Sequence, residues 1–316
     1  MVCWVSLVYY FKIINQPKYL ITMTKDKFVD ILLEKYTEDH VIQDDKYFYF
    51  YKHIALDEKN LVLGVFDNTQ LKYNYADNFN DPYDALFHFE LENLDNLTKE
   101  QFEDITDKPI TKADWTLGKK IIIRKFEESY RPIMKSEVTK LRKKIPITCF
   151  NSNPLNILMW SHYADHHKGI MLEFKILKDF SGKLLPIPVN YLNVFPIIKM
   201  SFPALMEISS STNASIDFEL IEKALLRKSN CWEYEKEYRV FGAEKDSLLI
   251  GYDPLILSSV IIGTKFKSTN KFTLLNKSVS AFNKMNKTKV KIYETKLMED
   301  RYELYVENHP RLDRKL

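Results

Sequence analysis

The chain has 316 residues, of which 45% are hydrophobic and 14% aromatic, enough apolar material for a sizeable core. Its 46 Lys and Arg residues against 43 Asp and Glu residues give a net charge of +3, so no global basic field would hold a nucleic acid by phosphate neutralisation alone. Seven scattered glycines exclude a G-x-G-x-x-G turn and a Walker-type phosphate loop, and three distant cysteines fit neither a disulfide framework nor a zinc knuckle.

The cysteine content is typical of a reducing compartment, so the sequence predicts a cytoplasmic protein. Residues 1–14 are apolar, but a bilayer-spanning helix needs about 20 such residues, and we expect no membrane contact. Met23 begins a more ordinary N-terminal sequence. We therefore expect translation to start at Met23, with residues 1–22 as an upstream extension, which mass spectrometry of the native N-terminus would test.

The first third of the domain is predicted to be rich in strands. Apolar residues at helical spacing predict an amphipathic helix over residues 25–35. Aromatic and β-branched residues then predict strands over residues 47–54, 60–66 and 70–75. Turn-forming residues interrupt this pattern over residues 77–84.

Residues 97–142 are charged and weakly periodic, which predicts a helical insertion with helices near 98–101 and 121–138 on the outside of a sheet. A strand-helix-strand unit is expected next. Its strands would be residues 145–150 and 169–176, and its helix residues 154–164, opened by Asn153-Pro154 as cap and first-turn residue.

Serine and threonine residues make 202–215 the best candidate for a mobile loop or lid, followed by a helix over residues 216–228. The C-terminal third is predicted to contain four strands and one helix. The strands are residues 235–241, 257–262, 289–295 and 301–306, and the helix is residues 270–285.

These elements predict an α+β fold with a central mixed or antiparallel sheet flanked by helices. The chain shows no internal repeat, long linker or low-complexity run. We therefore expect a single domain over residues 47–306 that includes the insertion. An N-terminal extension and helix (residues 1–46) would precede it, and a tail (residues 307–316) would follow it.

Residues 159–169 contain three histidines within six positions, at the predicted end of a helix just before a strand, where functional residues often lie. His162 and His166 would lie one helical turn apart if the helix continued, which is a zinc-ligand spacing. Because no third ligand is evident nearby, we predict no metal site and prefer polar capping of the helix end by His166 and His167.

Residues 228–240 are the second unusual segment. If this segment is extended, Glu233, Glu235, Glu237 and Arg239 share one face. Crowded carboxylates repel one another, which raises their pKa toward values useful for acid-base chemistry. The alternative is a solvated edge strand in which Glu237 pairs with Arg239.

Two earlier segments carry polar groups beside aromatic residues. Lys52 and His53 end an aromatic strand and could present a cation or an imidazole to a pocket, although a core histidine is the commoner case. Asn80-Asp81-Pro82 is typical of an Asx-type turn that holds a loop in place.

Taken in order, four motifs resemble the bacterial family called domain of unknown function 2971, over about residues 47–306. The motifs are Tyr51-Lys52-His53, Phe79-Asn80-Asp81-Pro82-Tyr83-Asp84, Met159-Trp160-Ser161-His162-Tyr163-Ala164 with His167-Lys168-Gly169, and Trp232-Glu233-Tyr234-Glu235-Lys236-Glu237-Tyr238-Arg239. The family pattern usually has arginine where His53 stands. The resemblance implies an accessory or defence-island protein and no particular activity.

A more remote similarity is to ADP-ribosyltransferases, which combine a His or Arg on an early strand, an aromatic platform and a late Glu. It implies that His53, Glu235 and Glu237 are catalytic, and that NAD is a substrate with no permanently bound cofactor. The target would be a protein or a nucleic acid. The remaining candidates for substrate binding are Lys52, Trp160, His162, Tyr163, Trp232 and Arg239.

Two other classes of function stay open. One is a non-enzymatic sensor or partner-binding module, whose recognition pocket would be formed by the aromatic residues Trp160, Tyr163, Trp232 and Tyr238. The other is a metal-dependent nuclease-like hydrolase, in which a divalent ion would be bound by Asp81, Asp84, Glu235 and Glu237.

Overall fold

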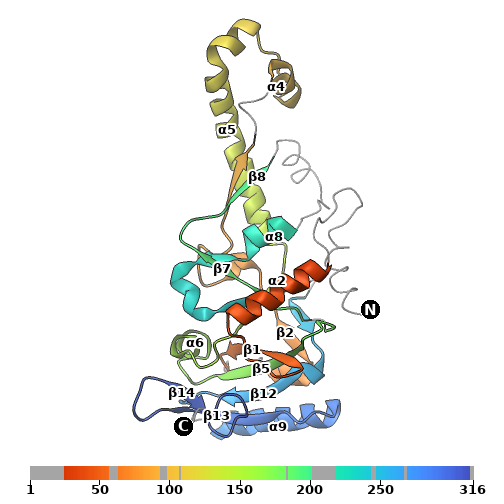
Figure 1. Cartoon of the computed structure of the whole chain (residues 1–316), viewed down its shortest axis with the longest axis vertical. Helices are drawn as coiled ribbons and strands as arrows, with labels where there is room; N and C mark the ends of the chain where they lie inside the picture. The colour runs from red at the N-terminus through yellow and green to blue at the C-terminus, as the bar shows by residue number, and fades with distance from the viewer. Residues whose placement is uncertain are drawn as a thin grey trace.

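The computed structural model describes residues 25–56, 63–92, 98–106, 108–182, 184–200, 218–242, 247–266 and 269–313. The predicted extension over residues 1–22 and the predicted loop over residues 202–215 lie outside these ranges. Within them the fold is α+β, as predicted, with helices around a large curled sheet (Figure 1).

The sheet has eight strands in the order β14-β13-β12-β5-β1-β4-β10-β6. All neighbouring pairs in this sheet are antiparallel except β12 and β13, which are parallel and are joined by a helix. The strands are β1 (Tyr47–Ile54), β4 (Ile147–Asn151), β5 (Ile170–Leu177), β6 (Ile187–Pro188), β10 (Glu237–Phe241), β12 (Leu257–Ile262), β13 (Lys291–Leu297) and β14 (Leu304–Val306).

Both faces of the sheet are buried at β1, which explains the continuous aromatic run of this strand. Phe48 and Phe50 belong to one apolar cluster, and Tyr49 and Tyr51, which alternate with them, belong to another. Helix α9 (Thr269–Asn286) buries Leu275, Val279 and Phe282 in the cluster of Phe48, as expected for an amphipathic helix on a sheet.

Two further helices cover the sheet. Helix α2 (Lys25–Glu38) inserts Leu32 and Tyr36 into the cluster of Phe48, and the Tyr36 hydroxyl donates a hydrogen bond to the Pro186 carbonyl. Helix α6 (Ile157–Tyr163) lies in the cluster of Tyr51 and contributes Trp160. The helix predicted at 154–164 therefore exists but begins later, because Asn156 rather than Asn153 caps it.

The predicted insertion contains α4 (Lys99–Thr106) and α5 (Lys112–Arg142). These helices lie outside the sheet, and α4 and most of α5 extend well beyond it instead of covering one of its faces (Figure 1). The expected strand over residues 60–66 is wrong: its described part forms the short helix α3 (Gly64–Asp67), which buries Val65 and Phe66.

Three small sheets complete the described strands. They pair β2 (Gln70–Lys72) with β11 (Leu249–Gly251), β3 (His88–Leu91) with β8 (Ile197–Met200), and β7 (Asn190–Leu192) with β9 (Arg227–Ser229). Helix α8 (Phe218–Leu225) ends just before β9, so the helix predicted to reach residue 228 stops early.

Residues of the predicted tail dock on the sheet. Arg311 donates from Nε to Glu173 Oε1 over 2.9 Å and from Nη2 to Glu173 Oε2 over 2.5 Å. The buried Ser259 hydroxyl donates to the same carboxylate over 2.9 Å and lies 3.1 Å from His309 Nε2. Glu173 is fully buried on β5, so these contacts fasten residues 309–311 to the middle of the sheet.

Candidate functional site

The site lies where two central strands stop pairing. Strands β1 and β4 share one pair of opposite Cα positions, Tyr51 and Asn151. Beyond this pair, side chains supply the contacts between the strands: Asn151 Nδ2 donates to the Tyr51 carbonyl over 3.0 Å, and Lys52 Nζ donates to the Cys149 carbonyl over 3.0 Å. The backbone ladder is therefore open at this point in the sheet.

A cavity of about 930 Å³ is lined by residues from both sides of this opening. Its volume is in the range typical of sites for small molecules and cofactors. The lining also includes residues 68–80, β10 and α6, which are far apart in the sequence. Among the predicted site residues, the cavity is lined by Lys52, His53, Tyr163, Glu235 and Glu237.

The strand register places His53 and Glu237 on one face of the sheet, whereas Lys52, which precedes His53 on β1, points to the other face. Asn151 is opposite Tyr51 on β1 and opposite Glu237 on β10. Directly opposite residues in a sheet point to the same face, and so do residues two apart along a strand. His53, two residues after Tyr51, therefore shares a face with Asn151 and Glu237.

A turn, rather than an extended strand, brings Glu235 next to Glu237. Residues Asn230–Glu235 form a 3-10 helix, and Lys236 adopts a left-handed conformation with φ of 45° before β10 begins. The expectation of four charged residues along one strand face is therefore wrong, because Glu233 lies on the exposed side of this turn. Glu235 and Glu237 nevertheless both point to Lys228.

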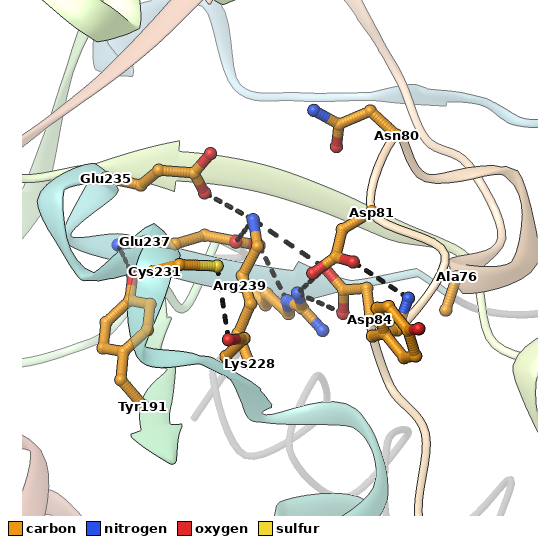
Figure 2. Close-up of polar contacts among 12 residues, drawn as sticks. Ala76, Asn80, Asp81, Asp84, Tyr191, Lys228, Cys231, Glu235, Glu237 and Arg239 are labelled. Atoms are coloured by element: carbon orange, nitrogen blue, oxygen red, sulfur yellow. Dashed lines mark hydrogen bonds and ion pairs between the residues drawn. The ribbon is translucent and has the colours of Figure 1, made fainter. Parts of the chain in front are cut away.

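Lys228, on β9, lies among three carboxylates (Figure 2). Its Nζ donates to Glu235 Oε2 and, over 2.9 Å, to Glu237 Oε2, and it lies 3.8 Å from Asp84 Oδ2. All four side chains are buried. A buried cation between carboxylates replaces the hydration that each group loses on folding.

Arg239 closes the network behind Glu237 (Figure 2). Its Nε donates to Glu237 Oε1 over 2.7 Å, and its Nη2 donates to both carboxylate oxygens of Asp84 over 2.7 Å. Its Nη1 donates to the Leu225 carbonyl over 2.6 Å. Arg239 is fully buried and is not among the residues that line the cavity, so it contacts the carboxylates from the protein interior and not from the cavity.

The environment moves the pKa values of the two glutamates in opposite directions. Burial and the nearby Glu237 carboxylate raise the pKa of Glu235 to about 7, although Lys228 opposes the shift. Burial also acts to raise the pKa of Glu237, but the charges of Arg239 and Lys228 outweigh it and hold this pKa well below the ordinary glutamate value.

Tyr163 and Asn80 extend the network into the cavity lining. The Tyr163 hydroxyl donates to Glu235 Oε1 over 2.5 Å, and Asn80 Nδ2 donates to the Tyr163 hydroxyl over 3.2 Å. Burial and the Glu235 charge raise the pKa of Tyr163. Tyr163 therefore stays a neutral donor that fixes one oxygen of Glu235.

His53 is a neutral imidazole in this site, because burial lowers its pKa to about 3. Asn151 Nδ2 is an amide nitrogen, which can only donate, and it also donates to the Tyr51 carbonyl. His53 Nδ1 is therefore the acceptor in its 3.0 Å hydrogen bond with Asn151 Nδ2. The Trp160 ring meets the imidazole edge-on at 4.9 Å between centroids. His53 can thus orient a ligand but brings no charge to it.

Four predicted site residues do not line the cavity. Trp160 is fully buried and donates from Nε1 to the Pro154 carbonyl over 2.9 Å, so it supports His53 from the core. His162 and Trp232 lie outside with ring centroids 6.5 Å apart, and Arg239 lies beneath the carboxylates. The aromatic pocket of a binding module is not formed, because Trp160 and Tyr238 are buried in different clusters.

The two metal-binding alternatives find no support in the geometry. Helix α6 ends at Tyr163, and residues 165–167 all have positive φ, so His162 and His166 are not one helical turn apart. Lys228 lies between three of the acids that a nuclease would need, and Asp81 forms the predicted Asx turn with the Tyr83 amide, over 2.9 Å. Within the described ranges no three His, Cys, Asp or Glu residues are grouped to hold a metal ion.

Two important residues of the site, Lys228 and Asn151, were not predicted from the sequence. Lys228 was not a candidate, although it contacts both glutamates, and Asn151 was not considered although it links β1 to β10. Asn151 lies in no recognisable pattern, whereas Lys228 belongs to the charged segment 228–240. The signal that finds Lys228 is the charge balance of residues 228–240, since buried carboxylates need a cation nearby.

The comparisons with known proteins agree with one expectation. Residues 159–240 match the model of a family described as "Protein of unknown function (DUF2971)", which confirms the family resemblance over a stretch containing Tyr163, Lys228 and both glutamates. No curated protein and no solved structure matches the chain. No helix in the part of the chain that the structure describes is long and apolar enough to cross a membrane.

Proposed function

We propose that the cavity binds NAD and cleaves the bond between nicotinamide and ribose, in a reaction like that of ADP-ribosyltransferases. The observation that carries this proposal is the convergence of His53, Tyr163 and the pair Glu235 and Glu237 on one cavity. These residues come from three distant parts of the chain. They match in kind the His or Arg, the aromatic platform and the late Glu that ADP-ribosyltransferases combine.

The chemistry uses the two glutamates differently. The C–N bond between ribose C1′ and nicotinamide breaks, and its electron pair leaves with nicotinamide, so positive charge develops on the ribose. Glu237 is held ionised by Arg239 and Lys228 and stabilises this charge. The cavity therefore holds a fixed negative group before the reaction begins.

Glu235 receives the proton in this mechanism. A hydroxyl or amine of the acceptor, which is water, a protein or a nucleic acid, forms the new bond to C1′ and gives its proton to Glu235. A pKa of about 7 suits a group that must accept and release a proton near neutral pH. Tyr163 and Lys228 fix the carboxylate, and His53 and Tyr163 offer surfaces to the ligand.

The test is release of nicotinamide from NAD by the purified full-length chain, with cell lysate supplying protein and nucleic acid acceptors. We expect Glu235→Gln to lower the rate by about 100-fold or more, the usual cost of losing a general base. Glu237→Gln should also be strongly impaired, because it removes the fixed negative charge. The matched control is Glu233→Gln, which changes an exposed glutamate of the same turn. If the wild type releases no nicotinamide under any of these conditions, the proposal fails.

A further inference from the structure

Lys52 is a cation in the cavity wall without an acidic partner. It lies on β1, is partly buried, and lines the cavity. Its Nζ donates to the Cys149 carbonyl over 3.0 Å and lies 5.6 Å from the centroid of the Phe150 ring. Within the described residues no carboxylate lies within ion-pair distance of this ammonium group.

The acids of the cavity are already matched by other cations. Asp84 and Glu237 are paired with Arg239, and Lys228 bridges Glu235, Glu237 and Asp84. Three carboxylates thus face two buried cations, and Glu235 is partly protonated near neutral pH. The network therefore keeps part of a negative charge, and Glu237 acts to raise the pKa of Lys52 without forming an ion pair with it.

Leaving a charged group partly buried without a partner costs free energy, and here burial lowers the pKa of Lys52. An anion in the cavity would remove this cost. Lys72, on β2, also lines the cavity, is exposed, and adds a second positive charge to the cavity lining. A lysine ammonium is a compact point charge with three donors, suited to phosphate oxygens.

We propose that Lys52 binds a phosphate group of the ligand, with Lys72 adding to the attraction, so that the cavity selects phosphate-bearing nucleotides over the corresponding nucleosides. The identity of the ligand as NAD rests on the function proposed above. The subsite itself rests only on the cavity and on Lys52, and any nucleotide with a phosphate at that position satisfies it.

Calorimetric titration of the full-length protein with ADP-ribose and with nicotinamide riboside, which lacks phosphate, tests the subsite. We expect wild type to bind ADP-ribose, Lys52→Gln to weaken this binding about tenfold or more, and Lys52→Arg to retain most of it. Lys52 is only partly buried, and glutamine keeps a polar amide donor at this position, so Lys52→Gln should fold. The Lys46→Gln control removes an exposed lysine just before β1, outside the cavity, and should bind like wild type. Affinity for nicotinamide riboside should not change in any variant.

Measuring both ADP-ribose binding and NAD cleavage distinguishes the proposed phosphate subsite from the proposed reaction. ADP-ribose binding that depends on Lys52, without cleavage of NAD, would support the subsite and reject the proposed function. Cleavage of NAD with the same KM in wild type and Lys52→Gln would support the function and overturn the subsite. Absence of ADP-ribose binding to wild type, or equal binding by both proteins, would also overturn it. Unfolding temperatures of the variants exclude a loss of binding through misfolding.

Discussion

Glu235 and Glu237 share the ammonium group of Lys228, yet their pKa values lie on opposite sides of the ordinary glutamate value. The difference comes from Arg239, which donates to Glu237 and not to Glu235. With two cationic donors Glu237 stays ionised. Glu235 has Lys228 and a neutral tyrosine as donors, and burial beside another carboxylate raises its pKa. A fixed charge and a titratable group are thus placed two residues apart.

The first prediction concerns the pH dependence of nicotinamide release. If Glu235 is the base, kcat/KM should rise as pH increases through about 7, because the ionised form accepts the proton. The residual activity of Glu235→Gln should lack this rise. Rates measured from pH 5 to 9 for both proteins check it, and an identical rise in the variant would show that another group is responsible.

The second prediction concerns Lys228. Replacing it by methionine leaves buried carboxylates without their shared cation, which should lower the free energy of unfolding by about 3–5 kcal/mol. Lys236→Met, which removes a surface ion pair with Glu233, should change it by no more than about 0.5 kcal/mol. Urea unfolding of both variants measures the difference, and similar midpoints would contradict a structural role for Lys228.

The third prediction concerns acid stability through Glu173. Burial alone would raise the pKa of Glu173, but the His309 ring, whose Nε2 lies 3.6 Å from Glu173 Oε2, and the hydrogen bonds and charge of Arg311 outweigh it and hold this pKa at about 2. Because the folded-state pKa is lowered, the stabilisation is complete above the unfolded value of 4.5 and is lost as pH falls toward about 2. The full effect is of order 3 kcal/mol.

Glu173→Gln should therefore be less stable than wild type at pH 7. The difference in free energy of unfolding between the two proteins, called the gap below, should be smaller at pH 3. Urea midpoints at these two pH values measure the gap. Glu294→Gln is the control, because Glu294 forms an exposed ion pair with Lys296 on the same strand, β13. An equal gap at both pH values would mean that ionisation of Glu173 is not what holds the C-terminal segment.

The fourth prediction separates two tryptophans that the sequence placed in the same site. Trp160→Ala should cost about 3–5 kcal/mol of stability, because its ring is fully buried against His53. Trp232→Ala should cost only about 0.5–2 kcal/mol, since this ring is partly exposed and its main polar contact is Lys228 Nζ at 4.9 Å from the centroid. Thermal unfolding distinguishes them, and equal losses would contradict the different burial.

The local pattern of the sequence predicted much of the framework. Strand β1 was predicted with its observed bounds, because alternate aromatic residues that pack on two faces give a strong local signal. The helix predicted over residues 154–164 started too early, since two asparagines could cap it and only the fold selects Asn156. The strand expected over residues 60–66 was wrong because the apolar residues Val65 and Phe66 are buried by a helix turn against α9.

By itself, the sequence determined the α+β class, most strands, and the two segments that supply Tyr163, Glu235 and Glu237, because these depend on residue preferences over short stretches. Only the tertiary structure decided which side chains meet. The opening between β1 and β4, the position of Lys228 and the turn at Lys236 arise from contacts between residues far apart in the chain. Such contacts leave no periodic signal in a single sequence, and they set the charges of the site through burial and distance.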